Sequence, residues 1–155
     1  MSPKIALGSD HHGIVVRTKV ADLLVSRNWT VIEIGPALSD GQPVDYPDIA
    51  GELSLLVSKG EAERGILICG TGIGMCIAAN KFAGIRAATV IDELSAVLSR
   101  RHNDLNVLCL SGDMLSEETI MHLVDVWLET PFDGGRHEKR LEKIRKIEDE
   151  LGMTT

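Results

Sequence analysis

Five short apolar runs alternate with segments of helical periodicity, and this alternation constrains the fold more than any other feature. The runs, rich in Val, Ile and Leu, are Lys4–Gly8, Thr30–Ile34, Gly65–Ile68, Arg86–Ile91 and Asn106–Leu110. Apolar residues recur at helical spacing in Ile14–Ser26, Ile49–Lys59, Met75–Lys81, Glu93–Arg101 and Glu117–Glu129. Strands that alternate with helices form parallel sheets. We therefore predict a doubly wound, Rossmann-like α/β fold with a five-stranded parallel sheet in the order 2-1-3-4-5.

A further helix is predicted from about Gly135 to Leu151, after the last strand-helix unit. Its apolar residues, Leu141, Ile144, Ile147 and Leu151, form a narrow stripe. Such a stripe needs a surface to cover it, either in its own domain or in a second subunit. The length of 155 residues and the hydrophobic content of 44% fit one domain spanning 1–155.

Composition excludes several classes of partner. A net charge of −7 and an aromatic content of 3% disfavour nucleic acid. No apolar run approaches the roughly 20 residues that a membrane span needs, and the N-terminus enters a strand pattern without a leader. Three cysteines without a C-x-x-C pair argue against disulfides and structural zinc, so we expect a cytoplasmic protein.

The stretch from Gly65 to Gly74 leads a buried strand into Cys69 and a glycine-rich turn. Gly70, Gly72 and Gly74 allow backbone N–H groups to converge on an anion, and a helix begins just beyond them. Such surroundings favour a thiolate, which is a competent base or nucleophile. The alternative is a small buried side chain, the interpretation we favour for Cys76 and Cys109.

Polar residues elsewhere are candidates for the same site. Asp10 and His11 follow the first strand, which the predicted order places beside the third, so both loops face one crevice. His102 and Asn103 suit proton transfer and sugar hydroxyl binding, while Arg136 and Arg140, which lie one turn apart, suit a phosphate. The alternatives are an N-cap at Asp10, a dipole-stabilising histidine at a helix end, and a solvated basic helix.

The glycine run is also similar to half of a dinucleotide fingerprint, with Asp92 about 20 residues beyond it. Against this, Met75 stands where the third glycine of that fingerprint belongs, and the loop follows the third strand rather than the first. A nucleotide-binding module remains an alternative from a different class.

Several ordered motifs span essentially the whole chain: Gly8-Ser9-Asp10-His11, Asp45-Tyr46-Pro47, Ile68 to Gly74, Ala78-Ala79-Asn80-Lys81, Gly84-Ile85-Arg86-Ala87, Ser99 to Asn106, and Gly135-Arg136-His137 with Arg140. Together they resemble the type B ribose-5-phosphate isomerases, which share their fold with the galactose-6-phosphate isomerase subunits. The resemblance implies an aldose-ketose isomerase of phosphorylated sugars that uses no metal and no cofactor. It also implies a homodimer with active sites shared between subunits, which could pair into a tetramer.

The resemblance further implies a role for each matching residue. Cys69 would move a proton between C1 and C2 of the sugar through a cis-enediolate, with ribose 5-phosphate and ribulose 5-phosphate as the leading pair. His102 would assist opening of the furanose ring. The residues implied to hold the substrate are Thr71 and the loop Gly70, Gly72, Ile73 and Gly74 at the oxyanion, Asp10, Asn103 and Tyr46 at the sugar, and His11, Arg136 and Arg140 at the phosphate.

The chain departs from the family pattern at two positions. Asp113 stands where many members have a phosphate-binding arginine, and His12 stands where small or apolar residues are common. A carboxylate at position 113 would repel phosphate unless it is neutralised. A tetrose 4-phosphate, allose 6-phosphate or galactose 6-phosphate is therefore an alternative substrate, and a non-catalytic partner subunit is an alternative role.

Overall fold

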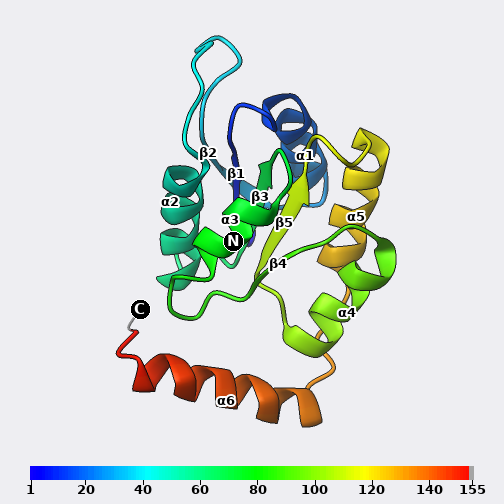
Figure 1. The fold of residues 1–155 in the computed structure, drawn as a ribbon. Coiled ribbons are helices and arrows are strands. Elements are labelled where there is room, and N and C mark those ends of the chain that lie inside the picture. The colour runs from blue at the N-terminus through cyan, green and yellow to red at the C-terminus, as the bar shows by residue number, and fades with distance from the viewer. Residues whose placement is uncertain (154–155) are drawn as a thin grey trace.

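The computed structural model describes residues 1–153 and has one five-stranded parallel sheet in the order β2-β1-β3-β5-β4 (Figure 1). The strands are β1 (Lys4–Ser9), β2 (Thr30–Ile34), β3 (Arg64–Cys69), β4 (Ala87–Thr89) and β5 (Val107–Ser111). The helices are α1 (Ile14–Ser26), α2 (Tyr46–Ser58), α3 (Ile73–Ala79), α4 (Glu93–Asn103), α5 (Glu117–Glu129) and α6 (Arg136–Glu150). The predicted α/β class is confirmed.

The last two strands are exchanged relative to the predicted order 2-1-3-4-5, since β5 lies beside β3 and β4 forms the edge. All five residues of β5 are buried, whereas the three residues of β4, Ala-Ala-Thr, are each partly exposed. A strand that is buried on both faces belongs inside the sheet, and a short, partly polar strand suits an edge. This difference in burial explains why the chain places β4 at the edge first and then inserts β5 between β3 and β4.

Helices cover both faces of the sheet. On one face, α1, α4 and α5 pack on a core that includes Leu7, Ile66 and Leu108. On the other, α2 and α3 pack on a core that includes Leu67 and Cys109. The connections β1–α1–β2 and β4–α4–β5 cross the sheet in one direction, whereas β2–α2–β3 and β3–α3–β4 cross it in the other. Because such crossovers are right-handed, α1 and α4 lie on one face and α2 and α3 on the other. The loops after β1, β3 and β5 therefore meet at the carboxyl edge.

Three helix boundaries differ from prediction near the candidate residues, and the first is that of α3, which begins at Ile73 rather than Met75. Helix α2 begins at Tyr46 rather than Ile49 because Pro47 occupies its first turn, where a missing N–H has no cost. Helix α4 continues to Asn103 and ends with Asp104 at a φ of 45°, so His102 and Asn103 lie in its last turn. Tyr46 therefore stands at a helix start, and His102 at a helix end.

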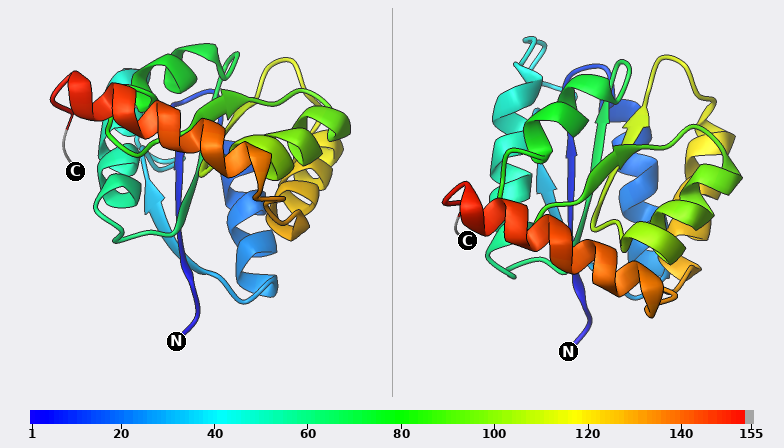
Figure 2. Two further views of the ribbon diagram at one scale, coloured as in Figure 1. Left: turned by 90° about the horizontal axis from the view of Figure 1, so that it is seen from below. Right: turned by 60° about the horizontal axis from the view of Figure 1, so that its bottom comes forward.

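Helix α6 lies across the end of the sheet opposite the carboxyl edge, as the views in Figures 1 and 2 agree. Its Leu141 is 2% exposed, but Ile144 and Ile147 are 42% and 55% exposed. Part of the predicted apolar stripe is therefore uncovered within one chain. Among residues 1–153, no helix has the length and apolar character needed to cross a bilayer.

The buried centre of β5 gives a test of the packing. Leu108 is fully buried, so Leu108→Ala should lower the free energy of unfolding by about 2–5 kcal/mol through lost burial and a cavity. Leu38→Ala is the control, because this leucine is 66% exposed and its truncation should change stability by less than about 0.5 kcal/mol. Urea unfolding at one fixed protein concentration measures both, and equal effects would contradict the packing described.

Candidate active site

The thiol of Cys69 lies at the carboxyl end of β3, where the glycine-rich loop leads into α3. The side chain is 4% exposed. Its Sγ accepts a hydrogen bond from the backbone N–H of Gly72 at 3.1 Å. Gly72 has a φ of 76°, and a Cβ there would lie 3.1 Å from the backbone of Leu110, so this turn needs glycine. The loop thus presents to the sulfur the kind of donor that favours an anion.

The loop after β1 lies beside the Cys69 loop, because β1 and β3 are neighbours in the sheet. The N–H of Asp10 donates to the carbonyl of Ile68 at 3.2 Å. The carboxylate of Asp10 is nearly buried and accepts from the N–H of His12 at 2.9 Å. Helix α1 is capped by Gly13 without a side-chain hydrogen bond, so Asp10 is not an N-cap. Its carboxylate instead fixes the turn that presents the two histidines.

Three more of the predicted residues, His11, Tyr46 and Thr71, lie at this edge. The ring of Tyr46 packs against Gly74, where a Cβ would lie 2.6 Å from Cζ. His11 accepts a long hydrogen bond at Nδ1 from the N–H of Val44, 3.4 Å away. Thr71 is exposed, and its hydroxyl accepts from the N–H of Ile73 at 3.3 Å. We call this set the thiol-loop group: Asp10, His11, Tyr46, Cys69, Thr71, and Gly70 with Gly72 to Gly74.

The loop after β5 completes the edge. Its Gly112 N–H donates to the carbonyl of Cys69 at 2.8 Å, and its Asp113 N–H to the carbonyl of Gly70 at 3.1 Å. The Asp113 carboxylate lies 3.2 Å from Nδ1 of His12. The two positions at which the chain departs from the family pattern are thus in direct contact, although 101 residues separate them.

A second group of candidates lies where α4 ends and α6 begins. The rings of His102 and His137 are stacked, with centroids 4.3 Å apart and planes 7° apart. Arg136 and Arg140 stand nearby on α6, and burial together with the positive charge of His102 and both arginines lowers the pKa of His137. We call His102, Asn103, Arg136, His137 and Arg140 the cationic group. Sequence reasoning placed His137 in a motif but gave it no role.

The two groups lie at opposite ends of the sheet. Helix α4 runs back from the carboxyl edge, and just after it Asn106 accepts from the N–H of Gly65 at the start of β3. Cys69 is four residues further along that strand, or about 13 Å at roughly 3.3 Å per residue. Figure 1 shows the same separation, with α6 at the bottom and the β3–α3 turn near the top. Within one chain, Cys69 and His102 are therefore too far apart to belong to the same site.

A metal fits the site poorly. Within residues 1–153, His102, Asp133 and His137 bring potential ligand atoms within 4.8 Å of one another. The lone pairs of two nearly parallel stacked rings point in parallel, however, and do not converge on one ion. Both oxygens of Asp133 also lie 3.1 Å from Nε of Arg101, and this hydrogen bond holds the pKa of Asp133 below its usual range. A cation would have to displace Arg101 and turn a ring.

Cys76 and Cys109 lie in α3 and β5, as expected, but Cys76 is not an ordinary buried thiol. A hydrogen bond from Cys109 is the main cause that lowers the pKa of Cys76 to about 6, against the opposing effect of burial. The same contact and burial raise the pKa of Cys109. Cys76 is therefore a second candidate base, which sequence spacing could not reveal.

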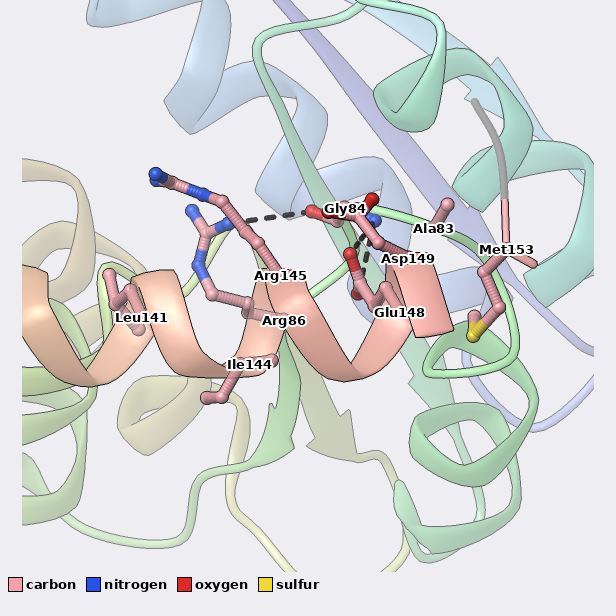
Figure 3. A pocket seen from close by; sticks show the side chains of 9 residues that line it. All are labelled: Ala83, Gly84, Arg86, Leu141, Ile144, Arg145, Glu148, Asp149 and Met153. Carbon is pink, nitrogen blue, oxygen red and sulfur yellow. Dashed lines mark hydrogen bonds between the residues drawn. The ribbon is translucent and has the colours of Figure 1, made fainter. Parts of the chain in front are cut away.

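A cavity of about 440 Å³ lies between α6 and the segment before β4 (Figure 3). The N–H of Gly84 donates to both oxygens of Glu148, at 3.2 and 3.1 Å. Arg86 and Arg145 extend beside this contact in Figure 3. No residue of the thiol-loop group or the cationic group lines this cavity. The cavity therefore belongs to the packing of α6 against the rest of the chain and not to the candidate active site.

A family model described as Ribose/Galactose Isomerase matches residues 5–144, a span that includes both groups. Ribose-5-phosphate isomerase B of Escherichia coli is 46% identical over 145 residues, covering 94% of this chain and 96% of its own. D-erythrulose-4-phosphate isomerase of Pectobacterium atrosepticum is 38% identical over 140 residues, covering 90% and 91%. The crystal structure of Mycoplasma genitalium ribose-5-phosphate isomerase B with bound ribulose-5-phosphate has a TM-score of 0.91 at 40% identity, covering 97% and 99%.

The poor fit of a metal gives a prediction. Exhaustive chelation should leave the catalytic rate and the melting temperature unchanged, because neither group of side chains forms a convergent set of ligands. Rate and melting curve are measured before and after chelation, with metal content checked by mass spectrometry. A loss of activity that one divalent ion restores would contradict the prediction.

Proposed function

The chain belongs to the ribose/galactose isomerase family, and we propose that it interconverts ribose 5-phosphate and ribulose 5-phosphate. The observation that supports this most is the Cys69 sulfur, held by a loop amide at 3.1 Å on the edge where Asp10 and His11 also stand. Isomerisation needs a base next to a site for developing negative charge, and this edge supplies both.

In the proposed mechanism, Cys69 acts as a thiolate base on the open-chain sugar. It takes the proton from C2 of the aldose, and the electron pair forms the C1–C2 double bond of an enediolate. The electron pair of the former C1 carbonyl bond moves onto O1, and a proton passes from O2 to O1. When Cys69 returns its proton to C1, the electron pair on O2 forms the C2 carbonyl of the ketose. Loop amides from Gly70 to Gly74 and the Thr71 hydroxyl hold the developing oxyanion, which stabilises the transition state more than the substrate.

The remaining roles divide between the two groups of residues. His102 assists opening of the furanose ring, and Asp10 and Asn103 hold sugar hydroxyls while Tyr46 contacts the sugar. His11, Arg136 and Arg140 bind the phosphate. Two guanidinium groups one turn apart on α6 suit the bidentate recognition of a phosphate.

We propose a homodimer in which each active site contains the thiol-loop group of one chain and the cationic group of its partner. The separation of these groups within one chain supports this, because a pentose phosphate cannot span it. Uncovered apolar side chains supply contact area for a second copy: Ile73 and Ile77 on α3, Leu94 on α4, and Ile144 and Ile147 on α6. Pairing of dimers into a tetramer is an extension of the same proposal.

Two alternatives are a different sugar phosphate as the substrate and a nucleotide-binding function. The erythrulose-phosphate relative makes a tetrose phosphate the nearest alternative substrate. A dinucleotide site is disfavoured because Asp92, the residue it needs for ribose, caps α4 by accepting from the N–H of Ser95 at 2.7 Å. Turnover of tetrose, pentose and hexose phosphates by the purified chain decides among substrates. Heat stabilisation by NAD instead would favour the nucleotide module.

We propose that the chain acts as one domain in the cytoplasm. All three cysteines lie among the described residues as free thiols, which is typical of a reducing compartment.

The two candidate thiols can be told apart. Cys69→Ala should lower kcat by about 10²–10⁴-fold, the range expected for loss of a catalytic base. Cys76→Ala should lower it by less than about tenfold, because Cys76 contacts Ala87 and Asn80 rather than the loop amides. Circular dichroism checks that both variants fold. The larger loss in Cys76→Ala would make Cys76 the base and contradict the assignment.

Sharing of sites predicts complementation. Cys69→Ala and His102→Ala chains should each be inactive, yet mixing them with subunit exchange should restore activity, because hybrid dimers contain one intact site. Activity is followed against mixing ratio, with separately incubated variants as the control. No recovery despite exchange shown by mass spectrometry would argue against sharing.

A further inference from the structure

The carboxyl edge of the sheet contains no lysine or arginine in its loops. The segments 10–13, 35–45, 70–72, 90–92 and 112–116 contain five aspartates and two histidines, His11 and His12. From the loops of this chain itself, a phosphorylated ligand therefore meets fixed negative charge and only titratable positive charge, while the arginines of the proposed site come from the partner chain. A histidine that carries a proton is the one side chain of these loops that can offset a carboxylate there.

His12 is held by a carboxylate from a different loop. Its Nδ1 lies 3.2 Å from both oxygens of Asp113, across Gly70 from the side of α1 to the side of α5. Gly70 makes room for this pair, since a Cβ there would lie 2.8 Å from Oδ2 of Asp113. A carboxylate on Nδ1 fixes the ring orientation and leaves Nε2 to face a ligand. Within residues 1–153, Nε2 of His12 has no hydrogen-bond partner.

The other ionisable groups around His12 come from the same two loops. The ring of His11 is 4.5 Å away at an angle of 44°, and the Asp10 carboxylate binds the backbone N–H of His12 rather than its ring. Asp113 is the only carboxylate that the ring itself contacts among the described residues. The charge state of His12 thus decides whether Asp113 is paired.

We propose that His12 donates a hydrogen bond from Nε2 to the phosphate of the substrate and that Asp113 is the positioning residue for this contact. This rests on the proposed isomerase function. Position separates the phosphate from the reacting carbons: Cys69 is 4% exposed, whereas the side chains of His12 and Asp113 are 47% and 53% exposed. The pair stands at the rim, where the charged end of a sugar phosphate enters.

The sign of the pH effect follows from the charges. At low pH, imidazolium attracts phosphate and neutralises Asp113. As pH rises through the range in which histidine loses its proton, the donor charge disappears and Asp113 is left as a bare carboxylate. KM should therefore rise, by about three- to tenfold for a half-exposed charged contact. Titration of the phosphate itself near pH 6 affects all variants alike and is removed by comparing them.

The test measures kcat and KM for ribose 5-phosphate from pH 5.5 to 8.5 in wild type, His12→Asn and Asp113→Asn. His12→Asn should raise KM about three- to tenfold at low pH, with a smaller change in kcat, and flatten the profile. Asp113→Asn should lower KM at high pH. The matched control is His122→Asn, because His122 also forms an exposed pair with a carboxylate, Glu93 at 2.7 Å, but this pair involves neither His12 nor Asp113. Its profile should superpose on wild type.

A KM profile of His12→Asn identical to that of wild type would overturn the inference while leaving the isomerase function standing. Absence of turnover with every sugar phosphate would overturn the proposed function instead. An independent measurement then decides the inference: titration of wild type with inorganic phosphate, followed by NMR of the histidine Cε1–H resonances. His12 should shift and His122 should not, and an unmoved His12 resonance would overturn the contact.

Discussion

The parallel pairing of β1 with β3 is the constraint on which the site depends. It aligns Ser9 with Ile68 and so places Asp10 and Cys69 at the same edge of a rigid sheet. On the other side of β1, a buried arginine joins the end of this strand to the segment after β2, since Arg17 donates to Ser9 Oγ at 3.1 Å and to the carbonyl of Pro36 at 2.7 Å. A rigid sheet edge of this kind keeps the thiol of Cys69 and its backbone donor in place next to Asp10.

Electrostatics divides the molecule into two complementary ends. The carboxyl edge holds the thiol among aspartates, whereas the arginines and stacked histidines stand at the other end of the sheet on α4 and α6. Two chains packed so that unlike ends meet would place fixed positive charge beside the acidic edge. The net charge of −7 shows why a phosphosugar needs this local arrangement, because the chain as a whole repels anions.

The sequence predicted what depends on local pattern. Periodicity identified every strand and helix, and the glycine run identified the loop beside Cys69, because both follow from short-range geometry. The order of β4 and β5 was wrong because it depends on how deeply each strand is buried. Three further features could not be predicted because they depend on contacts between distant parts of the chain. They are the pairing of His12 with Asp113, the lowered pKa of Cys76 next to Cys109, and the stacking of His137 on His102. The division of one site between two chains stays a prediction, which rests on the resemblance to a family with shared sites and not on spacing.

The central claim is that one active site is assembled from two chains. Its most direct test is a purified hybrid of one wild-type chain and one chain with both Cys69→Ala and His102→Ala, separated by an affinity tag on one of them. If sites are shared, each site of the hybrid lacks one of the two residues, and its activity should fall at least about 100-fold below that of the wild-type dimer. If each chain carries its own complete site, the hybrid should retain half of the wild-type activity, and that result would contradict the account.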